Sequence, residues 1–273
     1  MWAGLTRWRE RRIITRYPIS DDAWQCALDS AAMLQALSAD ERLRLRDLST
    51  LFLHRKQLVG AHGLEISPAM AATIAAQACL PILELGLPWY RRWQTVVVHA
   101  DEFVARQVCH DADGLAHEGN SVMVGEAWEQ GPIVLSWADI AATRPESADG
   151  GADGNVILHE FAHALDMLNG DANGFPPLHS GMNTNDWVAA FSAAYAHLCD
   201  CVDADVSTWP VDPYAVESPG ECFAVLTETF FTRPADLVVA YPAVHAQLVA
   251  FYRQDPLRRG VGCSSDSRTR STC

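Results

Sequence analysis

The sequence predicts an α+β fold that is mainly helical and contains one small mixed sheet. Apolar residues recur every three to four positions before residue 85 and again after residue 155, which is the spacing of one-sided helices. Short β-branched runs lie between these regions, from residue 95 to residue 137, and are typical of buried strands. We therefore expect helices before and after a segment of the chain that forms a sheet of few strands.

The chain has 273 residues, of which 49% are hydrophobic, enough for one large domain with a buried core. We expect a single domain over residues 1–257, with a helical first part at about 20–85 and a second part at about 90–255. Residues 258–273 are rich in Ser and Arg and contain few apolar side chains, so we expect a disordered tail there.

Three helices are predicted in the first part. The first opens with Ser-Asp-Asp at residues 20–22 and continues through apolar positions to Leu34. The second begins with the capping box Ser-Ala-Asp-Glu at residues 38–41 and ends before Gly60. The third covers residues 67–83 and has a proline in its first helical position.

Strands are predicted at residues 95–99, 121–124 and 132–137. Each run is short and contains Val or Ile, and a turn at Gln130-Gly131 separates the last two. Together they predict a small mixed or antiparallel sheet.

Four helices are predicted after the strands. A loop at residues 144–155 supplies an Asp or Asn cap to the first of them, which ends at Asn169-Gly170. The second covers the apolar positions from Trp187 to Leu198, the third runs from Pro219 to Thr232, and the last covers residues 235–253.

Composition argues against several classes of function. Lys and Arg number 20 against 34 Asp and Glu, and the net charge of −14 disfavours binding to nucleic acid. No apolar run approaches the roughly 20 residues that span a bilayer, and no signal-peptide core follows the basic N-terminus. The eight cysteines form no C-x-x-C pair and are expected to be free thiols. We therefore expect a cytoplasmic protein that binds neither membrane nor nucleic acid.

One pentapeptide indicates a metal site. Residues 159–163, His-Glu-Phe-Ala-His, place two imidazoles four residues apart, so a helix stacks them on one face. Counted from His159, His163 lies at about 40° and Asp166 at about −20° around this helix, whereas the apolar residues gather on the opposite side. This H-E-x-x-H arrangement is typical of zinc peptidases, in which Glu160 would be the general base. It predicts zinc-dependent hydrolysis of peptides.

A catalytic zinc ion takes three protein ligands, so a third ligand is required. The extension of the motif that supplies a third histidine is absent, because Asp166 and Asn169 occupy the positions of its glycine and histidine. Glu221 on a later helix is the leading candidate, and Glu228 is the second. Glu221 can also close a capping box with Ser218, so its spacing alone leaves both roles open.

Two further acidic residues can support the ligand histidines, and one cysteine segment offers an alternative zinc site. Asp166 is expected to accept a hydrogen bond from a ligand histidine, and Glu228 can do the same if it is not a ligand. A plain surface acid is the alternative for Asp166. A structural zinc site on the segment Cys199-Asp200-Cys201 is a weaker hypothesis, because a second cysteine pair is missing.

The metal motif and the segment Tyr-Ala-Val-Glu-Ser-Pro-Gly-Glu at residues 214–221 resemble the Mlc titration factor A family of bacterial zinc-dependent peptidases. The likeness covers roughly residues 15–255. Further segments that resemble the family lie at residues 76–81, 125–128 and 131–137.

The resemblance implies a zincin-like fold. The family is a gluzincin and is similar to the catalytic domain of anthrax lethal factor, in which a tyrosine precedes the ligand glutamate at the spacing of Tyr214 and Glu221. The resemblance therefore implies that Glu221 is the third ligand of one Zn²⁺ ion, beside His159 and His163, and that Tyr214 is catalytic.

The resemblance also implies an activity and an alternative to it. The activity is aminopeptidase-like hydrolysis of short peptides, in which Glu160 moves the proton and the Tyr214 hydroxyl stabilises the oxyanion. We expect the strand region Gly125–Trp137 to bind an extended substrate at the edge of the sheet. The alternative follows from the name of the family, which refers to sequestering a transcriptional repressor of sugar transport. Partner binding with weak or secondary hydrolysis is thus the second hypothesis.

Overall fold

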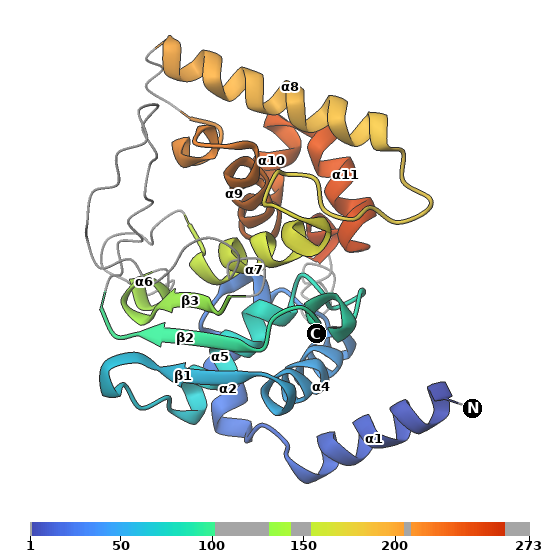
Figure 1. The fold of residues 1–273 in the computed structure, drawn as a ribbon, viewed down its shortest axis with the longest axis vertical. Coiled ribbons are helices and arrows are strands. Elements are labelled where there is room, and N and C mark those ends of the chain that lie inside the picture. Colours follow the sequence, from blue (N-terminus) through green and yellow to red (C-terminus); the bar gives the residue numbers. More distant parts are fainter. Residues whose placement is uncertain (1, 102–130, 143–153, 205–208, 260–273) are drawn as a thin grey trace, which may run out of the picture.

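The computed structural model describes residues 2–101, 131–142, 154–204 and 209–259 (Figure 1). The first part of the chain contains the helices α1 (Trp2–Arg16), α2 (Asp21–Asp29), α3 (Ala32–Gln35), α4 (Ala39–Arg55) and α5 (Pro68–Cys79), with the 3₁₀ turns η1 (Ala61–Gly63) and η2 (Leu87–Tyr90).

Serine caps start three of these helices, as predicted. The side chains of Ser20, Ser38 and Ser67 accept backbone N–H groups at the starts of α2, α4 and α5. At α4 the Ser38 N–H also donates to the Glu41 carboxylate at 2.9 Å, which closes the predicted capping box.

Two predicted helices end early. The first breaks at Ser30, because its hydroxyl and its N–H both donate to the Ala27 carbonyl. The chain resumes as the short helix α3. Helix α5 stops before the predicted end at Leu83, because Pro81 has no N–H to continue the helical hydrogen bonds.

The described strands form a parallel sheet: β1 (Gln57–Gly60), β2 (Thr95–His99) and β3 (Ile133–Ser136). They lie in the order β1-β2-β3, and Val96 pairs with Leu58 on one side and Ile133 on the other. The prediction of strands at β2 and β3 is confirmed, but mixed or antiparallel pairing is wrong for these three strands. The segment between β1 and β2 contains α5, and a crossover of that length permits parallel pairing.

Strand β1 was not predicted from the sequence. It has four residues and follows α4 after Lys56, so the preceding helical pattern masks it. The strand predicted at residues 121–124 lies outside the described residues.

The second part of the chain is helical again. Its elements are α6 (Trp137–Ala142), α7 (Val156–Asp166), η4 (Met167–Asn169), α8 (Thr184–Asp203), η5 (Pro213–Val216), α9 (Pro219–Thr232), α10 (Pro234–Ala240), α11 (Pro242–Tyr252) and η6 (Pro256–Arg259). The predicted bounds of α9 are confirmed, whereas the last predicted helix is divided at Pro242, which lacks the N–H that a continuous helix needs. Of the helices described, none has both the length and the apolar content needed to cross a bilayer.

The disorder expected from residue 258 is not found at residues 258 and 259. Arg258 and Arg259 belong to η6, and Arg259 donates to the Glu41 carboxylate at 3.0 Å and to the Gln254 side chain at 2.7 Å. Composition alone missed this, because the partner Glu41 is far away in the sequence. Residues 260–273 lie outside the described residues.

Helix α7 occupies the centre of the fold, between the sheet and α9 (Figure 1). Its fully buried Phe161 packs with ring centroids 5.1 Å from both Tyr90 and Trp93 and 5.9 Å from Phe52. The apolar side of α7 therefore packs against aromatic residues from the first part of the chain. This packing leaves the side that carries the histidines to face α9.

Candidate active site

Helix α7 presents two histidines on one face. The Asn155 side chain caps the helix by accepting the Leu158 N–H at 2.9 Å, and the motif follows within the first turns. The rings of His159 and His163 have centroids 4.8 Å apart, and their Nε2 atoms lie 3.1 Å apart. Both imidazoles thus converge on one point, as the four-residue spacing predicts.

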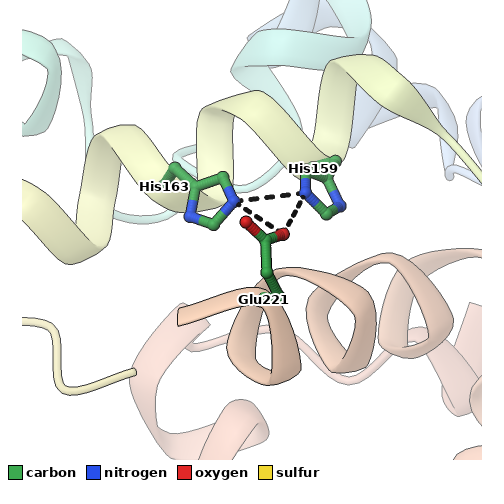
Figure 2. A group of neighbouring side chains, drawn as sticks. All are labelled: His159, His163 and Glu221. Atoms are coloured by element: carbon green, nitrogen blue, oxygen red, sulfur yellow. Dashed lines mark hydrogen bonds and ion pairs between the residues drawn. The ribbon is translucent and has the colours of Figure 1, made fainter. Parts of the chain in front are cut away.

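Glu221 in the first turn of α9 completes this cluster (Figure 2). Its Oε2 atom lies 2.8 Å from His159 Nε2 and 3.2 Å from His163 Nε2. Ser218 still caps α9 by accepting the Glu221 N–H at 3.1 Å, but the carboxylate turns to the histidines instead of back to the cap residue. The structure therefore directs Glu221 toward the metal motif.

The cluster has the dimensions of a metal site. Ligand atoms from His159, His163 and Glu221 all lie within 4.8 Å of one another. Ligands about 2 Å from one tetrahedral zinc ion lie about 3.3 Å apart, close to the separations found here. Two imidazole nitrogens and one carboxylate oxygen are a donor set that suits zinc.

Electrostatics also favour a cation at this point. Burial opposes the ionisation of Glu221, but hydrogen bonds with His159 and His163 outweigh it and lower the pKa of the carboxyl. Burial likewise opposes protonation of His159, yet its bonds to Glu221 and Glu228 raise the pKa of the imidazole. A proton on His159 thus supplies the positive charge that a bound metal ion would otherwise supply at this point.

Glu160 lies between the two histidines in the sequence of α7 and faces a small cavity. The cavity has a volume of about 70 Å³ and is also lined by His163, Arg92 and residues 131–133, which lead into β3. Burial raises the pKa of Glu160, and the neighbouring histidines oppose that rise. A carboxyl in this environment is suited to accepting and releasing a proton.

Tyr214 lies over the cluster on η5. Its backbone N–H donates to the Asp212 side chain at 2.9 Å, and the Tyr195 hydroxyl holds the same turn by donating to the Val216 carbonyl at 2.9 Å. The ring centroid of Tyr214 is 5.9 Å from that of His159, and 44% of the residue is exposed. Burial and three nearby carboxylates raise the pKa of Tyr214, so its hydroxyl stays a hydrogen-bond donor at neutral pH.

Glu228 lies behind His159. Its Oε1 atom is 2.6 Å from His159 Nδ1, on the side of the ring opposite to Glu221. Glu221 and Glu228 therefore contact different nitrogens of one imidazole. A carboxylate at Nδ1 fixes the orientation of the ring and leaves Nε2 directed at the cluster.

The structure does not bring Asp166 to a ligand histidine, contrary to the prediction. Its Oδ2 atom accepts the Gly174 N–H at 2.7 Å in the loop after α7. Among the described residues, neither Asp166 Oδ1 nor His163 Nδ1 has a hydrogen-bond partner. Asp166 is fully buried, so the alternative of a surface acid is also wrong.

The hypothesis of a structural zinc site on Cys199-Asp200-Cys201 gains no support. Cys201 lies 3.9 Å from His197, one turn earlier on α8. Within the described ranges, the one group of His, Cys, Asp or Glu side chains with metal-site spacing is the cluster of His159, His163 and Glu221.

Sequence reasoning missed Gln77 on α5, which donates to Ser30 and accepts from the Asn155 side chain at 2.8 Å. A signal for it exists: a glutamine in a run of small apolar residues, Ala-Ala-Gln-Ala, on a buried helix. Spacing within one helix could not reveal its partner 78 residues later.

Comparison with known proteins agrees with this geometry. The chain matches the family described as "Glucose-regulated metallo-peptidase M90" over residues 5–253. It is 37% identical over 237 residues to "Mlc titration factor A" of Klebsiella pneumoniae subsp. pneumoniae, covering 86% of this chain and 87% of the relative. It is 39% identical over 244 residues to the protein of the same name from Salmonella arizonae, covering 88% of this chain and 94% of the relative.

The family match spans α7, η5 and α9, which carry the cluster. Similarity over this length, together with a candidate metal site of two histidines and a glutamate, establishes the family of metallopeptidases to which the protein is related. The chain therefore belongs to the glucose-regulated metallo-peptidase M90 family.

Proposed function

We propose that the protein is a zinc-dependent peptidase whose reaction centre consists of His159, Glu160, His163, Tyr214 and Glu221. One observation carries the proposal: two histidines of α7 and the glutamate of α9 bring their ligand atoms within 4.8 Å of one another. Such a set of three protein ligands leaves a fourth position for water, as catalytic zinc sites do. Zinc bound there supplies Lewis acidity, which acidifies a water molecule and polarises the scissile carbonyl.

Glu160 is the proposed general base. It takes a proton from the attacking water and returns it to the leaving amine, which requires a carboxyl beside the metal ligands rather than among them. Its place on α7, beside both ligand histidines and facing the cavity, meets this requirement. The rise of its pKa on burial brings the carboxyl closer to the range in which it can both gain and lose a proton.

Tyr214 is the proposed oxyanion donor. Its protonated hydroxyl, on a turn fixed by Asp212 and Tyr195, is available to stabilise negative charge on the carbonyl oxygen. The ring lies against His159 while nearly half of the residue is exposed, so a substrate can reach it.

The substrate that we propose is a short peptide, cleaved in an aminopeptidase-like manner. Among the described strands β3 is at the edge of the sheet, and Pro132 and Ile133 at its start line the cavity that Glu160 faces. An extended peptide beside β3 would therefore pass the proposed base. Residues 125–130, the remainder of the expected strand region, lie outside the described residues.

A substitution of the base tests the enzyme proposal. Glu160→Gln removes the proton acceptor but retains the ligands, so zinc content should be unchanged while cleavage of a peptide library falls at least about 100-fold. Glu65→Gln, at an exposed glutamate outside the site, is the control and should leave both unchanged. If zinc-loaded wild-type protein cleaves no library member, the enzyme proposal is wrong.

Binding of a transcriptional repressor is the second candidate function. It is favoured by the relatives, whose name, "Mlc titration factor A", denotes titration of Mlc. We propose that this chain binds a related repressor in the cytoplasm, where the free thiols Cys26, Cys79, Cys199, Cys201 and Cys222 would stay reduced. The Glu160→Gln variant should retain repressor affinity if binding and hydrolysis are separate functions.

A further inference from the structure

A chain of buried hydrogen bonds leads from His159 into the first part of the protein. Glu228 contacts His159 Nδ1 at 2.6 Å through Oε1, and its Oε2 atom accepts the backbone N–H of Asn155. The Asn155 side chain caps α7 through Oδ1. Asn155 therefore joins the carboxylate behind His159 to the start of the helix that carries His159.

The chain continues through α5 to α2. The Asn155 amide donates to Gln77 Oε1 at 2.8 Å, and the Gln77 amide donates to Ser30 Oγ at 3.0 Å. The Ser30 hydroxyl donates in turn to the Ala27 carbonyl at 2.7 Å. One hydrogen-bond chain thus links α9, the start of α7, α5 and the end of α2.

The donor and acceptor in each side-chain hydrogen bond from Asn155 to Ser30 are fixed by the backbone groups at its two ends, the Leu158 N–H and the Ala27 carbonyl. The Ala27 carbonyl can only accept, so the Ser30 hydroxyl donates to it and must accept from the Gln77 amide. The Leu158 N–H can only donate, so Asn155 uses its oxygen there and its amide toward Gln77. The side-chain amides of Gln77 and Asn155 therefore each have one permitted orientation.

Burial makes these bonds costly to break. Glu228, Asn155, Gln77 and Ser30 are each at most 7% exposed, so a member that loses its partner has no water to replace it. Thr73 on α5, one turn before Gln77, provides a contrast: it is fully buried, and its hydroxyl has no partner among the described residues. Gln77 differs from Thr73 because its hydrogen bonds connect it, through Asn155 and Glu228, to His159.

We infer that Gln77 is a positioning residue for His159. It holds the Asn155 amide, Asn155 holds Glu228, and Glu228 keeps the proton on Nδ1 so that the Nε2 lone pair points at the metal position. The inference rests on the proposed function in that it takes His159 as a zinc ligand. It adds a residue on a separate helix, 82 positions before His159 in the sequence, that sets metal affinity.

Zinc affinity of Gln77→Met tests the inference. Methionine has a similar length but cannot continue the chain, so zinc affinity, measured by competition with a chromogenic chelator, should fall about 10-fold. Thr73→Val, on the same buried helix but outside the chain, should leave zinc affinity unchanged. In the zinc-loaded proteins, the proton resonance of His159 Nδ1–H should be visible in the wild type and in Thr73→Val, and broadened in Gln77→Met.

Each outcome of this experiment decides a different point. If the wild type binds no zinc, the metal site itself is wrong and the proposed function fails first. If the wild type binds zinc and Gln77→Met binds it equally well, or if Thr73→Val loses as much affinity, the positioning role of Gln77 is refuted. If Gln77→Met does not fold by circular dichroism, Ser30→Ala replaces it. Its loss of zinc affinity should be smaller than about 10-fold, because Ser30 lies one hydrogen bond further from His159, and an unchanged affinity would refute the positioning role.

Discussion

Gly174 and Pro219 lie in direct contact, such that a Cβ atom at Gly174 would stand 2.5 Å from the Pro219 carbonyl oxygen. This contact joins the loop after α7 to the first turn of α9, two residues before Glu221. The loop is held from two sides, because Gly174 donates its N–H to Asp166 at 2.7 Å and accepts the Trp187 indole N–H at 3.1 Å. It therefore fixes the position of Glu221 relative to the histidines of α7.

Gly174→Ala should consequently destabilise both the fold and the site. Gly174 has φ +76°, which L residues rarely adopt, and the added methyl group would collide with backbone rather than with a movable side chain. We expect the free energy of unfolding to fall by about 2–3 kcal/mol in urea denaturation, and zinc affinity to weaken as Glu221 is displaced. Gly181→Ala is the control, because its Cβ would meet no atom within 4 Å. Equal behaviour of the two variants would contradict a positioning role for the loop.

Tyr214→Phe separates oxyanion stabilisation from metal binding. The ring contact with His159 is retained, while the hydroxyl that would stabilise the oxyanion is lost. We expect kcat to fall about 100-fold to 1000-fold at unchanged zinc affinity and nearly unchanged KM. The control is Tyr17→Phe, at an exposed tyrosine that stacks on His54 away from the site. A loss confined to KM would instead assign Tyr214 to substrate binding.

The sequence predicts those features that depend on near neighbours. The capping box of Ser38 and Glu41 and the start of α9 at Pro219 depend on residues within one turn, so local patterns located them. The spacing of His159 and His163 is equally local, and it predicted that both imidazoles lie on one face of α7.

Contacts between distant elements could not be predicted in this way. Spacing on α9 placed both Glu221 and Glu228 as candidate ligands, and only the packing of α9 against α7 shows that they reach opposite nitrogens of His159. Asp166 has the right angle on α7 to support a ligand, but the loop at Gly174 supplies a backbone N–H that it binds instead. The parallel sheet likewise depends on a crossover through α5, which strand patterns do not reveal.

Buried His245 should make the fold less stable in acid. Burial lowers the pKa of its imidazole, although Asp255 at 4.0 Å opposes that change. Because the folded-state pKa lies below 6.5, the unfolded chain takes up the proton first as the pH falls. The contribution of His245 to stability is therefore fully present above about pH 6.5 and is lost as the pH falls through the lowered folded-state value.

His245→Leu should reduce this pH dependence. We expect the free energy of unfolding to change less between about pH 7.5 and about pH 5.5 in the variant than in the wild type, since one group with a lowered pKa is removed. His54→Leu, at an exposed histidine on α4, controls for the exchange of a histidine for a leucine. An unchanged pH dependence in His245→Leu would show that this histidine titrates alike in the folded and unfolded chains.

Arg258 and Arg259 should differ sharply in their effect on stability, although they are neighbours. The Arg259 side chain is 8% exposed and bonds both Glu41 on α4 and Gln254, which itself donates to the Leu80 carbonyl at 2.8 Å. The Arg258 side chain is 87% exposed and pairs only with Asp255, three residues earlier, among the residues described. Arg259→Met should lower the free energy of unfolding by about 1–3 kcal/mol, because it leaves a partly buried carboxylate without its cation.

Arg258→Met is the matched control and should change stability by less than about 0.5 kcal/mol. The two variants also differ in their pH dependence. Burial acts to raise the pKa of Glu41, but bonds to Ser38 and the charge of Arg259 outweigh it and lower that pKa below 4.5. The stabilisation by the Glu41–Arg259 pair is therefore complete above about pH 4.5 and disappears as the pH falls through the lowered value. The denaturation curves of wild type and Arg259→Met should converge in that range, and a constant difference would mean that Arg259 stabilises the fold by packing rather than by charge.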